Sequence, residues 1–172
     1  MPTTFGNIQT MALAYQQICE GEGPWIALGN FTNAWYGYAK DIRSTLVSEP
    51  LALPATSTDY THHWAAFCAA SVEFLCERYG VPCPFWVHNP YYILSHPWYG
   101  DERENISSSA QQELMRTTAA PFAKRNIFCG NRIFQNKYEM SAWVQEARAK
   151  GITDPGEIWQ YARQKEISIH GG

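Results

Sequence analysis

The sequence is short of charged residues, and this shortage limits what the protein can bind. Only 17% of the 172 residues are charged, and the formal net charge is −3. A chain without excess positive charge is a poor general binder of polyanions, because non-specific affinity for nucleic acid comes from neutralising phosphates. These numbers still leave room for a local basic patch.

Long apolar runs and a leader pattern are also missing. No run approaches the roughly 18 apolar residues that cross a bilayer. The first ten residues have neither a positive start nor an apolar core. The five cysteines are an odd number at irregular spacings, which is typical of buried, reduced thiols. We therefore expect a cytoplasmic protein with no membrane partner.

The usual signatures of catalysis and metal binding are absent. The sequence has no Gly-x-Ser-x-Gly elbow, no His-Glu-x-x-His pair and no strand-preceded phosphate loop. Its crowded cysteines and histidines lack the close pairs of structural zinc sites; they are His62, His63, Cys68, Cys76, Cys83, His88 and His96. We therefore expect no metal, no cofactor and no catalytic residue. The missing signatures favour a non-enzymatic protein without deciding the question.

What is present is helical periodicity and many aromatic residues. The chain has 7 Trp, 10 Tyr and 8 Phe, most of which must form a core. Apolar residues recur at steps of three or four, with no alternating strand pattern, and predict helices over 4–20, 24–49, 60–80, 105–119, 137–151 and from 157 onward. The prediction is an all-α single domain of six or seven helices around an aromatic-rich core. Four prolines make 81–100 an irregular segment, and 137–172 forms a C-terminal helical hairpin that could be a semi-independent appendage.

The densest basic stretch lies in and after residues 122–134, with the sequence FAKRNIFCGNRIF. Its basic residues alternate with aromatic ones, a pattern that can bind single-stranded nucleic acid by charge and stacking; they are Lys124, Arg125, Arg132 and Lys137. The alternative is a turn between core anchors, with Arg125 and Arg132 capping helix ends or pairing with acids. This alternative explains the stretch without a ligand and is favoured. The acids Glu73 and Glu77 are most simply solvated helix positions.

The two C-terminal helices superficially resemble a helix-turn-helix. Their second helix begins with Asp154, Pro155, Gly156 and Glu157, an acidic start that phosphates would repel. A plain helical hairpin is the better interpretation. Trp143, Trp159 and Tyr161 could then hold a protein partner, because Trp and Tyr are prominent among binding hot spots.

Three runs also carry a family resemblance: PWIALGNF from residue 24, HWAAFCAA from residue 63 and RNIFCGN from residue 125. Together they resemble a family of small, uncharacterised bacterial helical proteins, some of whose relatives are linked to regulators or antitoxins. The resemblance covers residues 24 to about 138. It implies no reaction and no catalytic residue, and it suggests a binding or antitoxin-like role. The chain has no clear DNA-reading helix of its own, which puts direct DNA binding in doubt.

Two functional hypotheses follow. The first is a non-enzymatic, cytosolic interaction or regulatory module, an antitoxin-like protein or complex subunit with a protein partner. Its candidate binding residues are Lys124, Arg125, Asn126, Arg132, Lys137, Trp143, Trp159 and Tyr161. The alternative is a small enzyme or nucleic-acid-processing factor, with a site beside the proline-rich segment that would gather Cys83, His88, His96, Arg125 and Asn126.

Overall fold

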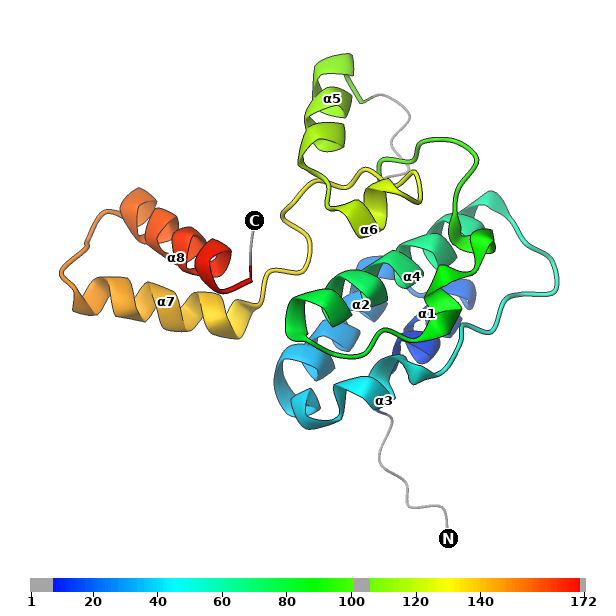
Figure 1. Cartoon of the computed structure of the whole chain (residues 1–172), viewed down its shortest axis with the longest axis horizontal. Coiled ribbons are helices and arrows are strands. Elements are labelled where there is room, and N and C mark those ends of the chain that lie inside the picture. The colour runs from blue at the N-terminus through cyan, green and yellow to red at the C-terminus, as the bar shows by residue number, and fades with distance from the viewer. Residues whose placement is uncertain (1–7, 101–105, 171–172) are drawn as a thin grey trace, which may run out of the picture. The chain divides into compact units, whose positions relative to one another are not determined.

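A computed structural model describes residues 8–100 and 106–170 (Figure 1), and in this part of the chain the all-α prediction is confirmed. Eight α-helices and several shorter helical turns are present there, with no strand and one isolated bridge between Trp98 and Ile127. The chain divides into two compact units. We call Met1–Ile133 the first unit and Phe134–Gly172 the C-terminal hairpin.

The first unit opens with two short helices. α1 (Met11–Cys19) begins where the Thr10 hydroxyl accepts a hydrogen bond from the Leu13 N–H, at 3.0 Å, which caps the helix. The predicted residues 4–7 of this helix lie outside the described residues. α2 (Pro24–Asn33) starts at Pro24, whose fixed φ suits a first helical position.

The single helix predicted over 24–49 is wrong, because the chain changes its winding after Asn33. A π-helical turn, η1 (Ala34–Tyr38), is followed by a 3₁₀ turn, η2 (Lys40–Ile42), and by α3 (Arg43–Ser48). The wider π turn rotates the following residues around the axis, and the neighbouring rings of Trp35 and Tyr36 are both buried. The Arg43 side chain donates a hydrogen bond to the Trp35 carbonyl, at 2.9 Å, where the regular backbone hydrogen bonds of the α-helix are interrupted.

The centre of the first unit is α4 (Asp59–Tyr79). The sequence offers Asp59 or Thr58 as the cap of this helix and Gly80 as its end. In the structure Thr58 caps the first turn through Thr61, and Gly80 ends the helix in the left-handed conformation at φ 65°. α4 packs against α1 and against three elements that come later in the chain. Every residue from Trp64 to Glu73 is buried, so this helix carries polar as well as apolar side chains into the interior.

The aromatic core lies along α4. Trp64 and Phe67 meet the rings of Trp25 and Trp98 edge-on, with ring centroids 5.1–6.3 Å apart. Phe122 contacts Phe67 at 5.3 Å. Edge-to-face pairs of this kind each add roughly 0.5–1.5 kcal/mol to the burial of the rings.

The proline-rich segment is irregular, as predicted. It contains two 3₁₀ turns, η3 (Phe85–His88) and η4 (Pro90–Tyr92), and both pack on α4. The Trp86 indole N–H donates to the Val47 carbonyl, at 2.8 Å, and so ties η3 to α3. Two further helices complete the first unit, the exposed α5 (Ser108–Thr117) and the four-residue α6 (Ala120–Ala123), which packs on α4.

The C-terminal hairpin consists of α7 (Lys137–Ala149) and α8 (Pro155–His170), which pack side by side (Figure 1). Asn136 caps α7, and the Asp154 carboxylate accepts from the Glu157 N–H, at 3.0 Å, to cap α8 as predicted. Gly151, at φ 86°, ends α7 and turns the chain. Among the described residues, no helix combines the length and the apolar character needed to cross a membrane.

Candidate functional site

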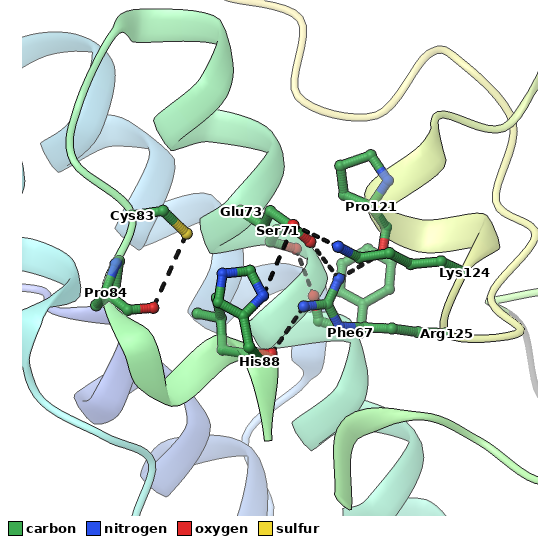
Figure 2. Close-up of polar contacts among 10 residues, drawn as sticks. Phe67, Ser71, Glu73, Cys83, Pro84, His88, Pro121, Lys124 and Arg125 are labelled. Atoms are coloured by element: carbon green, nitrogen blue, oxygen red, sulfur yellow. Dashed lines mark hydrogen bonds and ion pairs between the residues drawn. The ribbon is translucent and has the colours of Figure 1, made fainter. Parts of the chain in front are cut away.

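The first candidate site surrounds the carboxylate of Glu73, in the second turn from the end of α4 (Figure 2). The Arg125 guanidinium donates to Glu73 Oε2 and the Lys124 ammonium donates to Oε1, each at 2.5 Å. The Glu73 and Arg125 side chains are only 6% and 2% exposed, whereas Lys124 is 50% exposed. His88 stands at the surface with its Nδ1 3.9 Å from Glu73 Oε1. We call these four residues the Glu73 cluster.

The Arg125 side chain uses its planar fork to join three elements. Besides Glu73, it donates to the Pro121 carbonyl of α6, at 2.6 Å, and to the Val87 carbonyl of η3, at 2.7 Å. The interpretation of Arg125 as a residue that caps a helix end and pairs with an acid is therefore confirmed. The interpretation of Glu73 as a solvated position is wrong, because its partners come from a segment about 50 residues later, while Glu77 is exposed.

The charge balance of the Glu73 cluster fixes the state of its carboxyl group. Burial would raise the pKa of Glu73, but the hydrogen bonds and charges of Lys124 and Arg125 outweigh burial and hold this pKa below its usual value. The carboxylate is thus ionised near neutral pH, with a cation on each oxygen. A carboxylate held in this way is a weak proton acceptor, since a general base needs a pKa near the working pH.

Two cysteines lie near the Glu73 cluster, and both are poor nucleophiles. Burial raises the pKa of the Cys76 thiol to about 12. Burial also raises the pKa of Cys83, and the negative charges of Glu73 and Glu77 add to the shift. Thiols with raised pKa values stay protonated and react slowly. In residues 8–100 and 106–170, no three side chains of His, Cys, Asp or Glu form a group that could hold a metal ion.

The backbone after Arg125 is also engaged within the first unit. The N–H groups of Leu94 and Trp98 donate to the carbonyls of Arg125 and Asn126, at 3.0 and 2.8 Å. The Asn126 side chain donates to the Leu94 carbonyl, at 2.5 Å, and its φ of 63° is one that Asn tolerates better than most residues. Internal contacts therefore account for Arg125 and Asn126, and a binding role for them stays a prediction.

The remaining candidate residues are spread over both units. Lys124 and Arg132 are exposed in the first unit. Within the C-terminal hairpin, Lys137 and Trp159 are exposed, Tyr161 is half-buried and Trp143 is buried. For the alternative site, Cys83, His88 and Arg125 lie around Glu73, Asn126 joins Leu94, and the exposed His96 contacts the neighbouring Ser95 hydroxyl through Nδ1, at 3.0 Å.

The first unit also has an open hollow of about 650 Å³ beside α5, with a mainly apolar wall. Two of the polar side chains that line it are engaged in structural contacts. The Ser107 hydroxyl caps α5, and Glu113 pairs with Arg116 at 2.6 Å. Among the described lining residues, Ser107 and Glu113 are therefore committed to contacts other than the orientation of a substrate.

The second candidate site is a groove of about 460 Å³ at the end of the hairpin where α7 turns into α8. The turn is built by Gly151, by the capping Asp154 and by Pro155, and it separates the ends of the two helices. An apolar wall results, with one cation in it; the lining residues are Val144, Arg148, Ile152, Thr153, Pro155, Ile158 and Trp159. We call this feature the hairpin groove.

Sequence reasoning found Trp159 but missed Arg148, which lines the hairpin groove and whose side chain makes no hydrogen bond or ion pair with the residues that the structure describes. The other cations along the hairpin differ. Arg163 pairs with Glu166 at 2.6 Å, and Lys165 with Glu146 at 3.3 Å. The sequence carried no separate signal for the groove, because Ile152 follows Gly151 at the end of α7, where its N–H donates to the Ala147 carbonyl at 3.1 Å and an apolar residue is usual.

Comparisons of the chain with models of known families, with curated proteins and with solved structures found no match. The family resemblance carried by the three sequence runs stays a prediction.

Proposed function

We propose that the protein is a non-enzymatic, cytosolic interaction or regulatory module, antitoxin-like or a complex subunit, whose C-terminal hairpin holds a protein partner. The observation that carries this proposal is the hairpin groove, an apolar depression in which Trp159 is 45% exposed. Exposed aromatic side chains at the rim of an apolar depression are the usual anchors of protein interfaces.

The size of the hairpin supports the same proposal. Phe134–Gly172 is a unit of about 40 residues, and all five cysteines precede it, so no disulfide can staple it. Helical units this small bury little apolar surface and usually gain stability by association. Several of its large apolar side chains are exposed, and burying them against a partner would supply that stability; they are Tyr138, Trp159, Ile167 and Ile169.

The alternative, a small enzyme or nucleic-acid-processing factor, has weaker support. The Glu73 cluster brings a carboxylate, two cations and a histidine together beside the proline-rich segment, and His88 and Lys124 reach the surface there. Both oxygens of the Glu73 carboxylate are nevertheless occupied by cations, which leaves this carboxylate poorly suited to act as a general base.

The proposal is tested by affinity capture from the native host with nuclease-treated lysate. The baits are the full-length protein, Trp159→Ala and, as a matched control, Phe85→Ala, which removes an aromatic side chain that is 95% exposed in the first unit. We expect a stoichiometric protein partner on wild type and Phe85→Ala, and its loss on Trp159→Ala. A partner that Trp159→Ala retains, or capture of nucleic acid alone, would contradict the proposal.

A further inference from the structure

We infer that the hairpin groove binds an amphipathic helix whose apolar face is flanked by an acidic side chain, Asp or Glu, placed to pair with Arg148. This inference rests on the proposed function, because it names the chemistry of the partner at the same groove. It is built from the shape of the groove, the charge at its wall and the secondary structure around it.

The secondary structure around the groove selects the form of the ligand. The described residues of the C-terminal hairpin offer two helices and no strand, so an extended peptide has no sheet edge to extend. An apolar groove between helices instead suits a helix that presents anchors at positions i, i+3 or i+4, and i+7. Ile152, Ile158 and Trp159 are the surfaces that such anchors would cover.

The charge at the wall selects the side chains next to the anchors. Arg148 is the charged residue that lines the groove, and no carboxylate in the described part of the chain pairs with it. A helix docked on the apolar wall would remove water from one side of this guanidinium. An unpaired cation loses hydration without compensation, whereas an acidic residue on the ligand restores a charge-assisted, bidentate contact.

The same groups disfavour other ligands. A basic helix would place like charge next to Arg148, which lowers affinity and selects against the wrong partner. A nucleic acid would find one exposed cation here among apolar side chains and the acidic start of α8 at Asp154 and Glu157. Phosphate binding needs several cations along a surface, and this groove does not supply them.

The test uses a phage-displayed library of random peptides of about 16 residues, roughly four helical turns. Selections run in parallel on the full-length wild-type protein, on Trp159→Ala and on Arg148→Glu. The first variant removes the exposed ring of the groove. The second reverses its charge at an exposed position without breaking any described ion pair.

We expect wild type to enrich sequences with apolar residues at helical spacing and an Asp or Glu beside them. Trp159→Ala should lose these sequences, and Arg148→Glu should enrich Lys or Arg at the acidic position. For one selected peptide, Arg148→Glu should weaken binding roughly tenfold, because an attraction is replaced by a repulsion of similar size. Added salt should weaken wild-type binding and reduce this difference.

The possible failures distinguish the acidic-helix inference from the proposed interaction module. Trp159-dependent peptides without an acidic preference would overturn the acidic-helix inference and leave the interaction module standing. Selections with no Trp159-dependent enrichment would overturn both. Sedimentation tests whether a second copy of the chain occupies the groove. A wild-type dimer that the Trp159→Ala substitution dissociates would assign the groove to that second copy and overturn the inference.

Discussion

Removal of one charge from the Glu73 cluster tests whether this buried pair holds the first unit together. In Glu73→Gln the side chain keeps its shape while the carboxylate becomes a neutral amide. Arg125, whose side chain is 2% exposed, then stays buried as a cation without a counter-charge. Removing one partner of a buried ion pair costs about 3–5 kcal/mol, because the charge left behind is not compensated.

The structure places the expected loss at the lower end of this range. After the substitution, Arg125 retains its hydrogen bonds to the Pro121 and Val87 carbonyls, and the amide oxygen of the new glutamine can still accept one bond. We therefore expect the free energy of unfolding to fall by about 3 kcal/mol. Urea denaturation followed by far-UV circular dichroism measures this loss. Glu77→Gln, on the next turn of α4 and exposed, is the matched control and should change stability by less than about 0.5 kcal/mol.

The pH dependence gives a second measurement with a defined sign. The pKa of Glu73 is lowered in the folded protein, so its contribution is present above the unfolded carboxyl pKa of about 4.3 and is lost as the pH falls through the folded value. The stability gap between wild type and Glu73→Gln should thus be largest near neutral pH and shrink in acid. Equal stabilities at pH 7, or a gap that does not change with pH, would refute the reasoning.

The cluster, the thiols and the helix ends give three more expectations. Lys124→Ala should cost at most about 1 kcal/mol in urea denaturation, because Lys124 is half-exposed; a loss equal to that of Glu73→Gln would contradict this. Burial raises the pKa values of Cys76 and Cys129 to about 12. Iodoacetamide should therefore label these two thiols on the order of a thousandfold more slowly in the native protein than in urea, as measured by mass spectrometry. Equal labelling rates in the two conditions would contradict this expectation. Gly80→Ala, at φ 65°, should lower the melting temperature while Gly29→Ala, inside α2, should raise it; the same sign for both would contradict the backbone argument.

The sequence predicted the helix ends where the signal is local. Thr58 and Gly80 mark the ends of α4, and Asp154 with Pro155 marks the start of α8, because each acts on the backbone within a few residues. The break in the predicted helix over 24–49 could not be seen in the same way. It depends on burying both Trp35 and Tyr36 and on the reach of Arg43 to a carbonyl one element earlier.

The candidate sites show the same limit for side chains. Glu73 and Glu77 look alike in the sequence, one turn apart on a helix, yet one is buried and the other exposed. What distinguishes them is a pair of cations about 50 residues later in the chain. A single sequence without this fold has no signal for such a pairing, so the solvated interpretation of Glu73 followed from spacing alone.

Arg125 and Arg148 show which cation is the better candidate for a partner. Both are single arginines near apolar residues, and the density of basic residues around Arg125 drew the first binding hypothesis. A buried guanidinium must have its charge and its N–H groups satisfied, and Glu73, Pro121 and Val87 satisfy those of Arg125 inside the first unit. Arg148 lines an apolar groove, and no carboxylate in the described part of the chain pairs with it. The charge and N–H groups of Arg125 are satisfied within the chain, whereas the Arg148 guanidinium has no ion pair with the described residues. Charge recognition by this protein is therefore expected at the hairpin.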